Sequence, residues 1–196
     1  MSLYRARKDV CSAMTPYGKL IATCDELLTT GCTEKIGFQR PIPMLFTLGK
    51  KSVDFAALLS RQLALSPSSP TTPWSIILYQ DGVDPSDGLS KNHSRKTCVF
   101  YWSFLELGAC ALSHEECWFT ITILRELTVK TLNGAHARLT YLVLDQFLDD
   151  AGADHMAQGV DLQLHDGTTR TLHAKVKILL ADEPALKEMT SCILSG

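Results

Sequence analysis

The sequence lacks long apolar runs and a marked excess of either charge. No stretch approaches the roughly 18 uncharged apolar residues of a membrane helix, so we expect no membrane span and no membrane partner. The first ten residues contain no apolar block like that of a secretory signal peptide, which indicates an intracellular protein. Nineteen basic and 21 acidic residues give a net charge of -2, so no basic field covers the whole chain.

The motifs of common enzyme classes are also missing. The sequence contains no Gly-rich nucleotide-binding loop, no Gly-x-Ser-x-Gly nucleophile motif and no His-Glu-x-x-His zinc motif. None of the seven cysteines belongs to a Cys-x-x-Cys pair, and the nearest approach to a metal cluster is Cys110, His114 and Cys117. This set has too few ligands at too irregular a spacing for zinc, and we interpret the cysteines as reduced thiols.

What is present is the composition of a folded chain, 45% hydrophobic and 20% charged, with one clear break. Residues 66–73 comprise three prolines and five Ser or Thr residues, which predicts an exposed linker. It separates an N-terminal appendage, residues 1–65, from a longer part, residues 74–196. In the appendage, apolar residues between Tyr17 and Leu28 recur at helical spacing, and Ser52 is placed to cap a further helix.

The longer part is mixed α/β in character. Three runs rich in β-favouring residues predict neighbouring, largely antiparallel strands: Trp74–Tyr79, Cys98–Leu107 and Trp118–Leu124. A helix over 135–149, capped by Asn133, is expected next. The Asp166-Gly167 pair then predicts a hairpin between strands at 160–165 and 171–181. The order β-β-β-α-β fits several topologies, of which an incomplete ribonuclease-H-like domain with a mixed sheet is one.

Two aspartates follow the strands predicted at the centre of the sheet. Asp81 comes directly after the first strand and Asp182 after the last. If these strands lie side by side and parallel, both carboxylates can reach one divalent cation, and Mg²⁺ favours such oxygen ligands. The residues leave a second interpretation open, in which each Asp only ends its strand as a turn residue.

A small basic patch follows Asp81. Lys91, Arg95 and Lys96 fall in a segment rich in turn residues, and they are candidates for binding a nucleic-acid backbone. Charges on a loop are more commonly only solvated, and that alternative also stays open.

Several segments of the longer part resemble one family. These segments are Trp74–Asp81, Arg95-Lys96, Tyr101–Gly108, Glu116–Phe119 and Leu180–Met189. The family consists of uncharacterised, multi-copy proteins that are abundant in dinoflagellates and look like products of mobile elements. The resemblance implies a transposase or integrase of the ribonuclease-H-like class, with Asp81 and Asp182 as its first two catalytic, metal-binding acids. It further implies Mg²⁺ or Mn²⁺ as cofactor, DNA as partner and the nucleus as the place of action.

The sequence departs from the family pattern at two points. The family commonly has a second acidic residue directly after the first Asp, where this chain has Gly82. A third acidic residue and a Cys-x-x-Cys segment are expected only beyond Gly196, which predicts a truncated, inactive form of the enzyme. The alternative is a non-catalytic nucleic-acid-binding or protein-interaction module retained from a mobile element.

Overall fold

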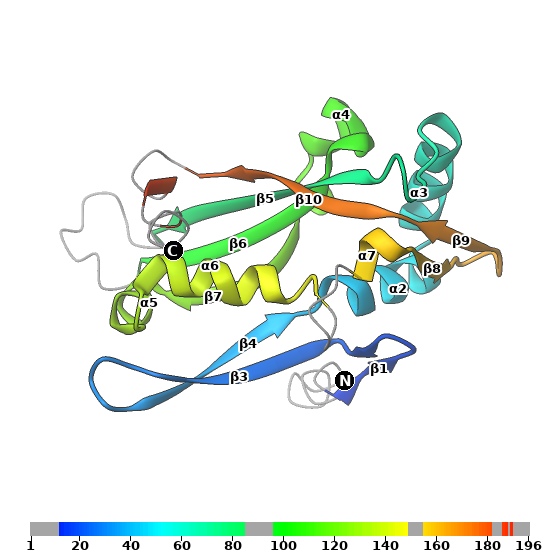
Figure 1. Cartoon of the computed structure of the whole chain (residues 1–196). Helices are drawn as coiled ribbons and strands as arrows, with labels where there is room; N and C mark the ends of the chain where they lie inside the picture. Colours follow the sequence, from blue (N-terminus) through cyan, green and yellow to red (C-terminus); the bar gives the residue numbers. More distant parts are fainter. Residues whose placement is uncertain (1–11, 85–95, 149–154, 182–185, 188, 190–196) are drawn as a thin grey trace.

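A four-stranded mixed sheet forms the centre of the computed structural model, which describes residues 12–84, 96–148, 155–181, 186–187 and 189. Its strands are β5 (Trp74–Val83), β6 (Thr97–Phe104), β7 (Phe119–Arg125) and β10 (Ala174–Leu180), in the spatial order β10-β5-β6-β7 (Figure 1). Strands β5, β6 and β7 pair antiparallel, whereas β10 runs parallel to β5. The mixed α/β class and the three neighbouring antiparallel strands are therefore confirmed.

The two faces of this sheet differ because side chains alternate along each strand. Trp74, Ile76 and Leu78 of β5 point into the main core, as do Phe100 and Trp102 of β6. The rings of Trp102 and Phe147 pack edge to face with their centroids 5.6 Å apart, which anchors the helical side of the sheet. We call this the helix face, and the face that carries Tyr79 and Tyr101 the outer face.

The strand ends differ from the sequence prediction. Strand β5 continues through Val83, because Val83 lies opposite Thr97 and accepts a hydrogen bond of 3.1 Å from the Thr97 hydroxyl. Strand β6 ends at Phe104 rather than at Leu107, since Glu106 turns back to accept hydrogen bonds of 2.9 Å from the backbone N–H of Ser75. The connection to β7 contains three short helical segments: η2 (Leu105–Leu107), α4 (Gly108–Leu112) and η3 (Glu115–Cys117).

Two helices follow β7, namely α5 (Glu126–Thr131) and α6 (Ala135–Asp145). The predicted apolar face of α6 is confirmed, because Leu139, Leu142 and Val143 are buried. The predicted Asn133 cap is wrong. Gly134 precedes the first helical residue with φ at +98°, and no side chain caps the helix, since a left-handed glycine already turns the chain into it.

The next segment contains α7 (His155–Gln158) and a hairpin formed by β8 (Val160–Gln163) and β9 (Thr169–Leu172). The predicted Asp166-Gly167 turn is confirmed, with Gly167 at φ +84° and the Thr168 N–H donating to the Asp166 carboxylate at 2.9 Å. The strand predicted over 171–181 is divided in two. Its first residues pair with β8, and after His173 the chain enters the central sheet as β10.

The N-terminal part is not the helix that its apolar spacing predicts. It forms a hairpin of β3 (Ile21–Leu27) and β4 (Thr33–Gln39), preceded by the short pair β1 (Met14–Thr15) and β2 (Gly18–Lys19). A turn at Gly31, with φ at +82°, closes the hairpin, and this backbone conformation favours glycine. Helices α2 (Pro41–Lys51) and α3 (Val53–Leu65) follow, and the Ser52 cap is confirmed by its 3.2 Å hydrogen bond from the Phe55 N–H.

The N-terminal part shares one core with the rest of the chain. Ile36, Phe38 and Leu59 belong to the same buried cluster as Trp74 and Trp102, and no residue of 66–73 is buried. Helix α6 lies between the β3–β4 hairpin and the central sheet in the view of Figure 1. The division of the chain into domains at 66–73 stays a prediction. Among the described residues, no helix has the length and apolarity to cross a membrane.

Candidate functional site

Asp81 lies on the outer face of the sheet near the end of β5. It is exposed and lies opposite Val99 of β6. The sequence places it after the strand, but the pairing of β5 with β6 continues for two more residues. Its carboxylate therefore belongs to a paired strand rather than to a loose turn, which fixes its backbone.

The neighbouring strand on the other side of β5 is β10. Asp182, the second predicted acidic residue, follows β10 in the sequence and lies outside the described residues. The last described pair is Leu180 opposite Tyr79. Asp81 comes two positions after Tyr79 in the sequence, and Asp182 comes two positions after Leu180. The structure thus brings the two predicted strands together in parallel, as the site prediction requires.

A bulge in β10 sets this register. Ala174 lies opposite Trp74, an offset of 100, whereas Leu180 lies opposite Tyr79, an offset of 101. The extra residue is Lys177, whose ammonium group donates hydrogen bonds to the carbonyl of Pro73 at 2.9 Å and to the Ser75 hydroxyl at 3.2 Å. A bulge inserts one residue into one strand and is commonly found beside functional sites. Here it shifts the offset to 101, the same number that separates Asp81 from Asp182.

The predicted basic patch is described only at Lys96, because Lys91 and Arg95 lie outside the described residues. The Lys96 side chain packs across Gly82, where an added Cβ would lie 2.7 Å from the Lys96 Cε. Since Gly82 follows Asp81 directly in a strand, its Cβ direction points to the opposite face. Lys96 therefore packs on the helix face, away from the Asp81 carboxylate.

The helix face beneath this point carries a buried polar pair. The Gln80 side chain donates to the Cys98 sulfur at 3.3 Å, and both residues are buried. Burial raises the pKa of the Cys98 thiol to about 11, although the hydrogen bond from Gln80 acts in the opposite direction. Since the thiolate is the reactive form of cysteine, this thiol is unsuited to nucleophilic chemistry near neutral pH.

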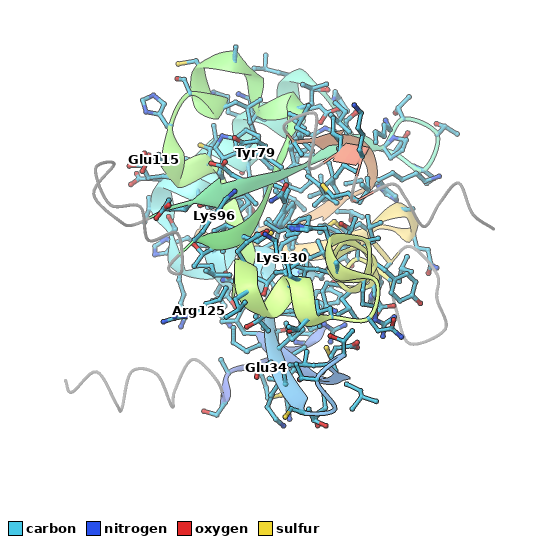
Figure 2. All side chains as sticks on the ribbon, turned by 90° about the vertical axis from the view of Figure 1, so that its left-hand side faces the viewer. Glu34, Tyr79, Lys96, Glu115, Arg125 and Lys130 are labelled. Atoms are coloured by element: carbon cyan, nitrogen blue, oxygen red, sulfur yellow. The ribbon has the colours of Figure 1, made fainter. Side chains whose placement is uncertain are left out.

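The outer face next to Asp81 carries a pocket that the sequence did not predict. Tyr79, Tyr101, Trp118 and Glu115 line a cavity of about 420 Å³. Figure 2 shows Glu115 and Tyr79 on the same side of the molecule. The sequence predicts Trp118 as the first residue of the third strand, but it directly precedes β7, and the strand pattern did not indicate the path of the connection that carries Glu115. One signal was available, namely that Tyr79 and Asp81 alternate at the end of a mainly apolar run and therefore share one face of the strand.

Carboxylate oxygens and aromatic rings are thus the functional groups at this end of the outer face. No group of three or more His, Cys, Asp or Glu side chains suited to a metal ion occurs among the described residues, which exclude Asp182. An exposed carboxylate on a paired strand supplies the donor that Mg²⁺ or Mn²⁺ prefers. The Asp81 side chain fits a divalent cation in its chemistry and in its access to solvent.

The chain was compared with protein-family models, with curated proteins and with solved structures, and no match was found in any of the three comparisons.

Proposed function

We propose that this chain is a ribonuclease-H-like domain of the transposase type, in which Asp81 and Asp182 bind Mg²⁺ or Mn²⁺ at the position from which the complete enzyme would act on phosphodiester bonds of DNA. In a ribonuclease-H-like sheet, three antiparallel strands are followed by a helix and then by a fourth strand parallel to the first. The order β10-β5-β6-β7, with β10 parallel to β5, supports this assignment. A domain that acts on DNA in a eukaryotic cell would work in the nucleus.

The register of β10 against β5 carries the proposal. If the offset of 101 continued for two residues beyond Leu180, Asp182 would lie opposite Asp81. Residues opposite each other on neighbouring strands point to the same face, and such strands are about 4.8 Å apart. The alternative, in which each Asp only ends its strand, does not account for a bulge that makes the strand offset equal to the separation of the two acids.

The two carboxylates would have two roles in this reaction. Both would hold the cation, which stabilises the negative charge that develops on a phosphate during attack by water or a 3′-hydroxyl group. The outer face leaves Asp81 exposed, so a DNA backbone has access to it from solvent. Without a cation, two neighbouring carboxylates would repel each other, so metal binding would be coupled to their loss of protons.

Metal binding is the first test, because it needs only this pair of residues. Titration of Mn²⁺ into the full chain, followed by the electron paramagnetic resonance signal of free Mn²⁺, should show one site. Asp81→Asn and Asp182→Asn should each weaken binding roughly tenfold or more, since each removes one of two charged ligands. Asp25→Asn is the matched control, because Asp25 is an exposed strand aspartate on the separate β3–β4 hairpin.

Cleavage is the second test. Incubation of a supercoiled plasmid with the chain and Mn²⁺ tests whether Asp81 and Asp182 suffice for catalysis without the third acidic residue of the family pattern, and nicking by the wild type but not by Asp81→Asn would show that they do. Wild-type protein that binds no Mn²⁺, or an Asp81→Asn variant that binds it unchanged, would overturn the proposal. Mn²⁺ binding with no nicking would favour the non-catalytic nucleic-acid-binding module instead.

A further inference from the structure

The pocket on the outer face has walls made of aromatic rings held in place. Tyr79 and Tyr101 lie opposite each other on β5 and β6, with ring centroids 6.2 Å apart and ring planes inclined by 24°. The Trp118 ring meets Tyr79 at 6.0 Å and 63°. The Trp118 N–H donates to the Leu112 carbonyl at 2.9 Å, which fixes the indole against the α4 segment. The pocket therefore presents aromatic surface in two orientations without the need for rearrangement.

Among the described residues, the charged groups that act on these rings are acidic. Glu115 lines the pocket, and Asp81 lies on the same face, two residues after Tyr79. Burial is the main cause that raises the pKa of the Tyr101 phenol, and the carboxylates of Asp81 and Glu115 raise it further. Both carboxylates thus act on the same hydroxyl group within the pocket. Such surroundings repel phosphate and carboxylate groups and attract cations.

We propose that this pocket binds a methylated ammonium group, either on a methylated lysine side chain or on a free quaternary amine. Faces of Trp and Tyr rings attract cations through their quadrupole, and methylated ammonium groups are bound by sets of such rings. The cavity of about 420 Å³ falls in the range of about 300–1,000 Å³ typical of small-molecule sites. It therefore has room for the ammonium head group and for part of the chain that carries it.

The carboxylate of Glu115 distinguishes this ligand from a nucleotide. A nucleobase could stack on the same rings, and stacking on aromatic side chains is a common mode of single-strand binding. Each base, however, brings a phosphate, which the Glu115 carboxylate in the pocket would repel. Glu115 and the three rings have no part in the proposed metal site, so the pocket proposal can fail or succeed independently of the proposed function.

Tryptophan fluorescence offers a direct readout. Trp74 and Trp102 are 1% and 0% exposed, whereas Trp118 is half-buried at the pocket. A ligand in the pocket should therefore change the emission of Trp118 far more than that of the other two. The full chain would be titrated with choline, with a peptide carrying trimethyl-lysine, with 3,3-dimethyl-1-butanol and with thymidine monophosphate. The butanol is the neutral analogue of choline with the same shape.

We expect saturable binding of choline and no binding of its neutral analogue. Tighter binding of the trimethyl-lysine peptide than of choline would identify a protein ligand, and the reverse would identify a free amine. Glu115→Gln should weaken binding about tenfold, as expected for loss of an adjacent charge. Because Glu115 is exposed, this variant should fold normally, and isothermal calorimetry would replace fluorescence where Trp118→Ala is tested.

Trp118→Ala should reduce choline binding roughly thirtyfold, since it removes the best cation-binding ring of the pocket. Tyr141→Ala is the control, because Tyr141 is an aromatic residue 59% exposed on α6, away from the pocket residues. Equal binding of choline and the neutral analogue, or unchanged binding by Glu115→Gln, would overturn the proposal. Thymidine monophosphate binding more tightly than choline would also overturn it and assign the rings to a nucleobase.

Discussion

The ion pair between Arg138 and Glu26 joins helix α6 to the β3–β4 hairpin, and its removal should measurably loosen this attachment. The Arg138 guanidinium donates two hydrogen bonds, of 3.0 Å and 2.8 Å, to the two carboxylate oxygens of Glu26. Such paired, charge-assisted bonds are stronger than those between neutral groups. The Glu26 side chain is only 13% exposed and that of Arg138 is 37% exposed, so the two single variants should differ.

Arg138→Met leaves the Glu26 carboxylate largely buried without its partner. Loss of a partner from a buried charged group costs about 2 kcal/mol. Glu26→Gln keeps one acceptor and leaves Arg138, which also lies 5.3 Å from the Tyr141 ring, in contact with water, so its cost should be about 1 kcal/mol. In a chain of this size, Arg138→Met should lower the melting temperature by about 4–8 °C.

A double-mutant cycle in urea, followed by tryptophan fluorescence, tests these values. The double variant should cost about 1–1.5 kcal/mol less than the sum of the two single variants. Lys35→Met is the control, because the Lys35–Asp25 pair is 66% and 59% exposed, and it should change stability by less than about 0.5 kcal/mol. A coupling energy below about 0.3 kcal/mol, or an Arg138→Met variant no less stable than Glu26→Gln, would refute the reasoning.

Three further predictions concern single positions. Burial raises the Cys98 pKa to about 11, so the folded chain retains this proton more firmly than the unfolded chain. The contribution of this thiol to stability is therefore complete below about pH 9 and is lost as the pH rises towards 11. A Cys98→Ala variant melted from pH 8 to 11 should show a shallower fall in stability than the wild type. Gly159→Ala should lower the free energy of unfolding in urea by about 2–3 kcal/mol, because φ is +102° and the new Cβ would lie 2.6 Å from the His173 Nε2. Gly31→Ala, at φ +82° with nothing within 4 Å of the new Cβ, should lower it by only about 1–2 kcal/mol. Equal losses would contradict the predicted clash at Gly159. Ser52→Ala should lower stability by about 1 kcal/mol, because it removes the cap of α3, and an unchanged urea midpoint would show that the cap is dispensable.

The two central strands β5 and β6 could be predicted from the sequence because they are buried on both faces over most of their length. The run Trp74–Tyr79 is mainly apolar and does not show the spacing of an amphipathic helix, so a central strand buried on both faces is the structure that it favours. The segment Ile21–Leu27 was predicted wrongly for the opposite reason. Half-buried and exposed residues largely alternate along this segment. Its few apolar side chains therefore fit helical spacing as well as they fit the spacing of a strand.

The candidate site was predictable only in part, because it depends on pairing between distant strands. The sequence indicated Asp81 and the parallel placement of β10, but a bulge at Lys177 is a property of two strands in register and leaves no local pattern. The pocket was missed for a similar reason. Tyr79, Tyr101 and Trp118 come from three separate segments, and only the antiparallel pairing of β5 with β6 and the path of the following connection bring their rings together.

The pairing of β5 with β10 also has a consequence for how the chain is made. Tyr79 and Trp118 are 39 positions apart, whereas Asp81 and Asp182 are 101 apart. Hairpins of neighbouring strands form readily, but distant parallel pairing is slow. At a synthesis rate of about 5–20 residues per second, β5 would wait roughly 5–20 s on the ribosome before β10 emerges. The aromatic pocket can assemble in that interval, while the apolar edge of β5 stays unpaired and prone to join another strand until β10 covers it.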